Sequence, residues 1–248
     1  MSTKRISRCG IALATALMLG GNTPASANLS GLSDTTIAKA FAGWQVGIEG
    51  LAAIRRPEEN WAAAKSRAQQ ADWAKWLGEA RGSLDRWMVL QREDPTKPVG
   101  WAHDYVDPKT GAFLTWSPDS APPPPGTSDK IRAAWAMEVR AYNIGQILEA
   151  ARLYRLLGEV RYRDWAVAQL DAYAANYSTL PLQNWHGQAH LFNQALDEAV
   201  YGFQLIEVVR LLRQDTPRET LDHWQRGLFE PMVGNLMRSE KSGNNIAV

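Results

Sequence analysis

The sequence predicts an all-α fold, a toroid of antiparallel helix hairpins interrupted by one long proline-rich loop. Apolar residues recur at three- and four-residue spacings along most of the chain, and turn residues divide these stretches into pairs. No alternation of strands and helices occurs, and neither a glycine-rich phosphate loop nor a cysteine set with metal-ligand spacing is present. The pattern argues against nucleotide-dependent and zinc enzymes, and we expect no cofactor and no metal.

The first 27 residues have the form of a secretory signal peptide. Basic residues precede the apolar stretch 11–19, and Ala25-Ser26-Ala27 follows it as a small-residue cleavage site. The apolar stretch is shorter than the ~20 residues needed to span a bilayer. We therefore expect residues 28–248 to be exported to the periplasm or secreted, with a retained membrane anchor as the less favoured alternative.

Composition limits the classes of partner. Removing the leader takes away three of the 27 basic residues and none of the 26 acidic ones, which leaves a net charge of about −2. A nearly neutral domain is a poor partner for nucleic acid. The only cysteine, Cys9, lies in the leader, so the exported domain must rely on core burial in place of disulfides.

Helical spacing begins at Leu32 and continues to Leu90. Arg56-Pro57 is expected to break the first helix, and the later tryptophans of this region are most simply core residues. Residues 93–129 differ, because repeated prolines exclude a regular helix. Within them, Tyr105-Val106 and Phe113–Trp116 flank a turn, which predicts two short paired strands in a packed functional loop.

The clearest periodic stretch, Ile131–Leu157, predicts a long helix that Gly158 ends. A second helix over Arg161–Tyr177 would complete an antiparallel hairpin with it. Leu196–Leu212 is apolar nearly all round, which predicts an inner helix covered by a second layer. Pro217 separates it from a further helix through His223, Trp224 and Phe229, and Pro231 is expected to bend or restart the chain.

Candidate chemistry gathers just before the inner helix, in the segment Asn184–His190. Trp185 offers a flat apolar face to a sugar ring. His186 and His190 would share a face if this segment were helical, and either can take a proton; Gln188 lies between them. Helix capping and packing explain the same residues equally well. A metal site is less favoured because no third ligand is evident.

Other polar residues have simpler structural explanations. Gln194, Asp197 and Glu198 open the inner helix, where the helix dipole favours acidic side chains. Arg163 lies at a helix start, where a cation gains nothing from the dipole. This placement mildly favours an anion-facing or interhelical role, although a solvated surface position is the commoner case. Asn244 and Asn245 follow a turn-like Ser-Gly pair, and asparagine-rich turns are common without any function.

Three segments in their order resemble the helical toroid of heparinase II/III-like and alginate-lyase-like polysaccharide lyases. They are Leu156–Ala166 (LLGEVRYRDWA), Phe192–Val200 (FNQALDEAV) and Gly243–Val248 (GNNIAV), and the proline-rich segment Tyr105–Gly126 looks like a loop module of these enzymes without its cysteines. The resemblance covers roughly Trp101–Val248.

The resemblance implies β-elimination on a uronic-acid polysaccharide such as alginate or a glycosaminoglycan. By position, Asn244 or Asn245 matches the asparagine that neutralises the sugar carboxylate; relatives often have Asn-His there. Trp185, His186 and His190 would lie at the cleft. In the family, the catalytic tyrosine follows this motif and a further histidine comes from a C-terminal β-sandwich. The resemblance therefore also implies that the toroid domain continues past Val248.

Three other readings compete with a lyase. A non-catalytic helical module would bind acidic glycans without forming a new double bond. A toroid glycoside hydrolase needs two carboxylates flanking the scissile bond, and the adjacent Asp197 and Glu198 point in different directions on a helix. A helical-repeat scaffold for protein partners would keep its partner when Trp185 and Asn245 are changed to alanine.

Overall fold

The structure, a computed structural model, describes residues 60–239 and confirms the predicted all-α class. The expected signal peptide, the helix expected before Arg56-Pro57, and the pair Asn244 and Asn245 lie outside the described residues. The α-helices are α2 (Trp61–Ala68), α3 (Ala71–Leu90), α4 (Asp129–Leu157), α5 (Val160–Asn176), α6 (Ala195–Leu212), α7 (Arg218–Trp224) and α8 (Glu230–Arg238). None of the helices within this range is long and apolar enough to cross a membrane.

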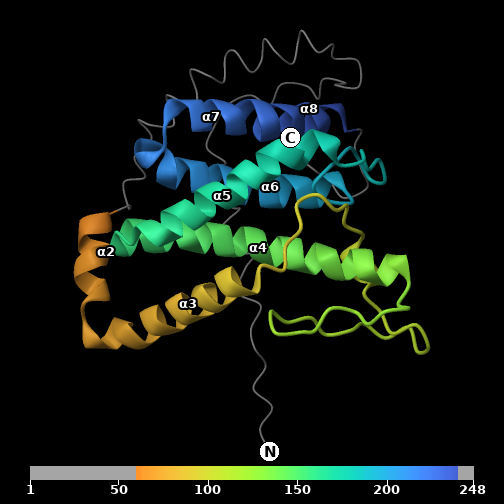
Figure 1. Cartoon of the computed structure of the whole chain (residues 1–248), viewed down its shortest axis with the longest axis horizontal. Coiled ribbons are helices and arrows are strands. Elements are labelled where there is room, and N and C mark those ends of the chain that lie inside the picture. Colours follow the sequence, from red (N-terminus) through yellow and green to blue (C-terminus); the bar gives the residue numbers. More distant parts are fainter. Residues whose placement is uncertain (1–59, 240–248) are drawn as a thin grey trace, which may run out of the picture.

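The longest helix, α4, is the centre of the fold (Figure 1). It begins at Ser128, whose hydroxyl accepts the backbone N–H of Ile131, and such a cap satisfies a donor that the helix leaves free. It ends at Gly158, which has φ +76°, a left-handed conformation that costs glycine nothing. The predicted helix and its glycine stop are therefore confirmed, with the start two residues earlier than expected.

Successive helices alternate in direction around α4. The colour order in Figure 1 shows α4 and α6 running the same way, while α5 returns between them in sequence and α7 and α8 run back over α6. α4 packs against both α5 and α6, and α5 packs against α7. As a result, the N-terminal ends of α4 and α6 lie at the same end of the layer, together with the loops that precede them.

The core lies where α4, α5, α6 and α7 meet. Its fully buried members include Ile144, Ile147, Leu170, Leu205 and Trp224. Each such side chain stabilises the fold by roughly 1.5–3 kcal/mol relative to exposure, so this cluster is the main source of stability in a domain that has no disulfide within the described range.

One helix prediction needs correction. Val200 and Phe203 of α6 are 49% and 63% exposed, so the expectation of a helix covered all round is wrong for that face. Pro231 lies in the first turn of α8, so the helix restarts where expected, and the π-helical turn Gln225–Phe229 joins α7 to that start. The Glu230 N–H bonds to the Gln225 carbonyl five residues back, and such a wider turn shifts the bonding register just before the proline.

The proline-rich region between α3 and α4 contains no α-helix and no regular strand. The expected hairpin is reduced to one antiparallel bridge, Val106 with Phe113, closed by an Asp107 side chain that accepts the N–H groups of Lys109 and Thr110. A 3₁₀ turn over Ala102–Asp104 precedes it. In Figure 1 the first, yellow part of the region rises past α4, and the later, yellow-green part lies below α4 on the side where α4 begins.

A buried arginine fixes this region to the helices. Arg140 of α4 is 1% exposed and pairs with Glu93 at 2.7 Å. Its remaining donors reach the carbonyl oxygens of Asp94, Lys97 and Leu191 at 2.7–3.0 Å. One guanidinium thus ties the start of the proline-rich region and the loop before α6 to the same point of α4.

Candidate functional site

The segment that the sequence singled out, Asn184–His190, is a tight loop and not a helix. An isolated bridge joins Gln183 to Ala189 across its base, and His186 and Gly187 at its tip have φ +57° and +94°. His186 and His190 therefore do not share a helical face.

Gly187 is required by its surroundings as well as by its backbone angle. A Cβ atom there would lie 2.6 Å from the Cβ of Ala195 and 2.9 Å from the Oγ of Ser239. The same Ser239 hydroxyl accepts the N–H of Gln188 at 2.7 Å. The loop tip is thus held between the start of α6 and the end of α8, and the backbone of Gln188 has a structural contact.

His190 faces the interior. Its Nδ1 lies 2.8 Å from the Leu180 carbonyl oxygen, and its ring meets the edge of Tyr177 at 5.0 Å between centroids. Because these contacts go to Tyr177 and Leu180, the structure does not bring the His190 ring to Trp185 or to the surface that Trp185 forms.

The carboxylate of Glu198 holds the loop from the protein interior. It is fully buried, and it accepts the Tyr177 hydroxyl at 2.6 Å and the backbone N–H groups of His190 and Phe192. Burial raises the pKa of Glu198 to about 7 against the lowering effect of these donors. The carboxylate orients the loop from inside and does not reach solvent.

The exposed face of the loop carries an aromatic platform with the proline-rich region. The Trp185 ring meets Trp101 with 4.8 Å between centroids, Trp101 stacks on His103 at 4.4 Å, and His103 meets Phe113 at 5.8 Å. His186 adds an edge contact to Trp185 at 4.0 Å. Four rings from two distant segments therefore form a continuous surface, which we call the aromatic platform: Trp101, His103, Phe113 and Trp185.

A cavity of about 430 Å³ opens beside Trp101 and Trp185. Its polar lining comes from Asp104, Lys130 and Asn193, and the Lys130 ammonium lies 3.0 Å from the Asp104 carboxylate. The Oδ1 of Asn193 is buried and has no hydrogen-bond partner among residues 60–239. A buried acceptor without a partner is costly, so a ligand hydroxyl here would gain a ready contact.

Two carboxylates from facing helices lie next to the platform. Burial raises the pKa of Glu138 on α4, and the nearby charge of Asp197 on α6 raises it further, whereas His103 lowers it. Burial likewise raises the pKa of Asp197. Its carboxylate accepts a hydrogen bond from the Gln194 amide at 2.8 Å, and this bond and the nearby His103 lower the pKa. Burial and both carboxylates raise the pKa of Tyr201 to about 12. The structure thus brings together two acids, an imidazole and a phenol.

Neither a protein family nor a curated protein matches this chain when the sequence is compared with them.

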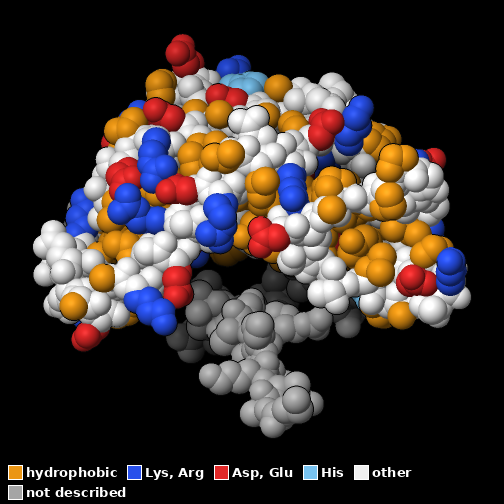
Figure 2. Space-filling model, turned by 60° about the horizontal axis from the view of Figure 1, so that its bottom comes forward, with side chains coloured by type: hydrophobic (Ala, Val, Ile, Leu, Met, Phe, Trp, Pro, Cys, Tyr) orange, Lys and Arg blue, Asp and Glu red, His pale blue; other side chains and the backbone are white. Residues whose placement is uncertain are grey.

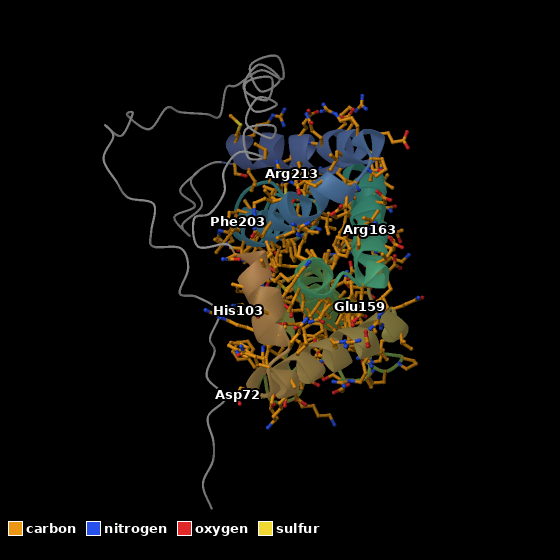
Figure 3. All side chains as sticks on the ribbon, turned by 90° about the vertical axis from the view of Figure 1, so that its left-hand side faces the viewer. Asp72, His103, Glu159, Arg163, Phe203 and Arg213 are labelled. Carbon is orange, nitrogen blue, oxygen red and sulfur yellow. The ribbon has the colours of Figure 1, made fainter. Side chains whose placement is uncertain are left out.

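The remaining residues suggested by the sequence lie elsewhere. Figure 3 shows Arg163 on the opposite side of the molecule from His103, and Arg163 pairs with its neighbour Asp164 at 2.8 Å. Gln194 is buried and reaches the site through Asp197. Within the described residues, no group of three or more His, Cys, Asp or Glu side chains is arranged to hold a metal ion.

Charge is evenly mixed on the face of the molecule shown in Figure 2, where basic and acidic side chains are interspersed with no large area of one sign. On this face, attraction for an acidic ligand would come from single charged groups. Beside the platform, Lys130 is such a group.

Sequence reasoning missed Trp101, His103, Lys130 and Glu138. The aromatics of the proline-rich region were a usable signal, since they already indicated a packed functional loop. Glu138 gave no such signal, because a single acid within a long helix is indistinguishable from a solvated one until its facing helix is known.

Proposed function

We propose that this chain belongs to a polysaccharide lyase that cleaves a uronic-acid-containing polysaccharide, of alginate or glycosaminoglycan type, by β-elimination. The observation that carries the proposal is the aromatic platform beside a polar cavity. Trp101 and Trp185 offer flat apolar faces to sugar rings, while Lys130 and Asn193 line the cavity next to them.

The cavity offers the interactions that the elimination needs. Removing the C5 proton of a uronate places negative charge on its carboxylate, and a preorganised ammonium or amide beside it stabilises that charge. Lys130 lies at the start of α4, and Asn193 precedes α6, so the positive ends of two parallel helix dipoles point to the same region. Asn244 or Asn245, matched by the family resemblance, would add an amide donor.

Proton transfer has candidates in the adjoining cluster. His103 is the proposed base for the C5 proton, because it is the histidine on the platform. Tyr201 stays protonated at neutral pH, with its pKa raised to about 12, and is the proposed donor to the leaving oxygen. These side chains would act without a cofactor.

The proposal includes the arrangement of the helices and the compartment. Parallel α4 and α6 with returning α5 and α7 support an α/α toroid whose inner helices share one direction. The proposed leader peptide would place the enzyme in the periplasm or outside the cell, where acidic polysaccharide is its partner.

A second candidate is a glycoside hydrolase, and it is favoured by a specific observation. Glu138 and Asp197 lie on facing helices, and both have raised pKa values, which suits a general acid paired with a second carboxylate. This pair replaces the adjacent Asp197 and Glu198 considered from the sequence alone.

One assay separates the candidates. The chain is incubated with alginate, heparin and chondroitin sulfate while reducing ends and the ultraviolet absorbance of a new C4–C5 double bond are both recorded. A lyase raises both signals, a hydrolase raises only reducing ends, and a binding module raises neither. His103→Ala should abolish the lyase signal, whereas His223→Ala, on the exposed side of α7, should leave it unchanged. Reducing ends without absorbance would overturn the lyase proposal.

A further inference from the structure

The same face of α4 that meets the platform cavity also lines two further cavities. The middle one, about 470 Å³, is lined by Tyr142, Gln146 and Glu149 of α4 together with Gln204 of α6. The far one, about 490 Å³, is lined by Arg152 and Leu153 of α4 and by residues of α2, α3 and α6. Glu149 lines both, so these two cavities adjoin each other.

The spacing along α4 shows that the three cavities lie in a row. One residue of α4 from each stretch of the row lies on the same side of the helix, because the residues follow one another at helical intervals. These residues are Lys130, Ala141, Gly145, Glu149 and Arg152. From Lys130 to Arg152 a helix rises by ~33 Å at about 1.5 Å per residue. On α6, Asp197, Gln204 and Leu211 share a face in the same way and follow α4 in parallel.

The far cavity has its own aromatic surface. Trp73 and Trp76 of α3 lie in its wall, 44% and 48% exposed, with 6.0 Å between ring centroids and their planes nearly perpendicular. Half-exposed indoles one helical turn apart are not needed for core packing. This pair presents the kind of surface that Trp101 and Trp185 present at the other end of the row.

The charges around the far cavity suit an acidic chain with hydroxyl groups. Arg67 and Arg152 line it, and Glu149 and Glu207 lie beside them. The Glu149 carboxylate is 3.9 Å from Arg152, and Glu207 is bound by Arg210 at 2.7 Å, so both acids are partly neutralised. In the middle cavity, the buried Oε1 of Gln146 has no hydrogen-bond partner among residues 60–239.

We infer that Trp73, Trp76, Arg67 and Arg152 form a second sugar-binding subsite, reached by the same polysaccharide chain that lies on the aromatic platform. This inference rests on the proposed function and deepens it. A substrate that occupies both ends of the row must continue past the reacting sugar, so the substrate is a long chain bound along its interior and short uronates fill only the platform end.

The test is binding of alginate fragments of two lengths to the full chain, measured by calorimetry. The double variant W73A/W76A should weaken binding of a long oligosaccharide by about tenfold and leave that of a disaccharide unchanged, since lost aromatic contacts are of that size. F203A is the matched control, because Phe203 is an exposed aromatic on a different face of α6 and should change neither affinity.

The outcomes distinguish this inference from the proposed function. If W185A weakens binding of both the long and the short fragment while W73A/W76A weakens binding of neither, the platform binds sugar and the second subsite is wrong. That result is expected if another segment or a protein partner covers Trp73 and Trp76. If the unaltered chain binds no fragment of alginate, heparin or chondroitin sulfate, both proposals fail. Circular dichroism of each variant confirms that a lost affinity is not lost folding.

Discussion

The indole rings of Trp101 and Trp185 meet nearly edge-on, with an interplanar angle of 66° and 4.8 Å between centroids. They come from the proline-rich region before α4 and from the loop before α6. Their contact means that neither loop forms the aromatic platform alone, and that each depends on its anchor in the helices beneath. Arg140 and Glu198 are those anchors, and they are the natural targets for testing how the site is supported.

Trp185→Ala should reduce affinity for long acidic oligosaccharides by about tenfold, because it removes the exposed half of the indole pair. Trp185 is 43% exposed, so the melting temperature should change little. Leu182→Ala in the same loop is the control, since Leu182 is similarly exposed and carries no ring. Calorimetric titration checks the affinity, and equal losses in both variants would contradict a specific role for Trp185.

Glu138→Gln should stabilise the domain at neutral and alkaline pH by about 0.5 kcal/mol, the size typical of like-charge repulsion between neighbouring side chains. The pKa of Glu138 is raised by burial and by Asp197, so the folded state binds its proton more tightly than the unfolded state. The stability that it contributes is therefore present at low pH and is lost as pH rises.

Urea unfolding of the wild type and of Glu138→Gln at several pH values measures this effect. The gain should shrink toward acidic pH, and it should shrink also in the Asp197→Asn background, because the repelling partner is then neutral. A gain that stays constant with pH would show that the two carboxylates do not interact.

Glu198→Gln should destabilise the domain by roughly 1–3 kcal/mol, since an amide cannot replace both carboxylate oxygens that accept from Tyr177 and Phe192. The pKa of Glu198 is raised to about 7, so wild-type stability falls as pH rises from the ordinary glutamate range through about 7. The cost of the substitution should thus be largest near pH 5 and smaller near pH 8, as thermal unfolding can show.

An opposite trend, with a cost that grows toward pH 8, would mean that Glu198 is ionised in the folded state and that its donors outweigh its burial. Tyr177→Phe provides the comparison, because it removes one donor while leaving the carboxylate in place.

Arg140→Met should destabilise the domain by about 3–5 kcal/mol, because it leaves the buried carboxylate of Glu93 without its charge partner. Arg161→Met is the matched control, since Arg161 pairs with Asp85 at the surface and exposed pairs contribute about 1 kcal/mol or less. Chemical denaturation measures both. Adding Glu93→Gln to Arg140→Met should recover part of the lost stability, because the buried carboxylate is then replaced by a neutral amide. If no stability is recovered, the destabilisation comes from the lost hydrogen bonds of Arg140 to backbone carbonyls.

The helices around α4 could be predicted because local spacing and caps determine them. Ser128 and Gly158 bound a stretch whose apolar period is unambiguous, and the structure follows it. The bridge of Val106 with Phe113 was predicted in position but not in extent, because the strands have no neighbouring sheet on which to extend.

The site was predicted only in part, since it depends on contacts between distant segments. Trp185 was identified because polar residues gather around it in one short segment. Its partner Trp101 lies in another loop, and sequence spacing cannot predict a contact between two separate loops. His190 was assigned to the cleft from the family resemblance. In the structure, the loop closed by the Gln183–Ala189 bridge directs the His190 ring to the Leu180 carbonyl instead. Asn244 and Asn245 remain predictions, as does the lyase chemistry that depends on them.

The parallel direction of α4 and α6 has a consequence for how such a protein can change. Both loops that form the platform enter at the same end of the helical layer. Val99, Leu191 and Phe192 of these loops belong to the core, whereas Phe113 and Trp185 are exposed. Insertions, deletions and exchanges confined to the exposed parts of these loops would therefore alter the platform without disturbing helix packing. Evolution, or an engineer, could obtain new surfaces on this scaffold by exchanging one pair of exposed loop segments.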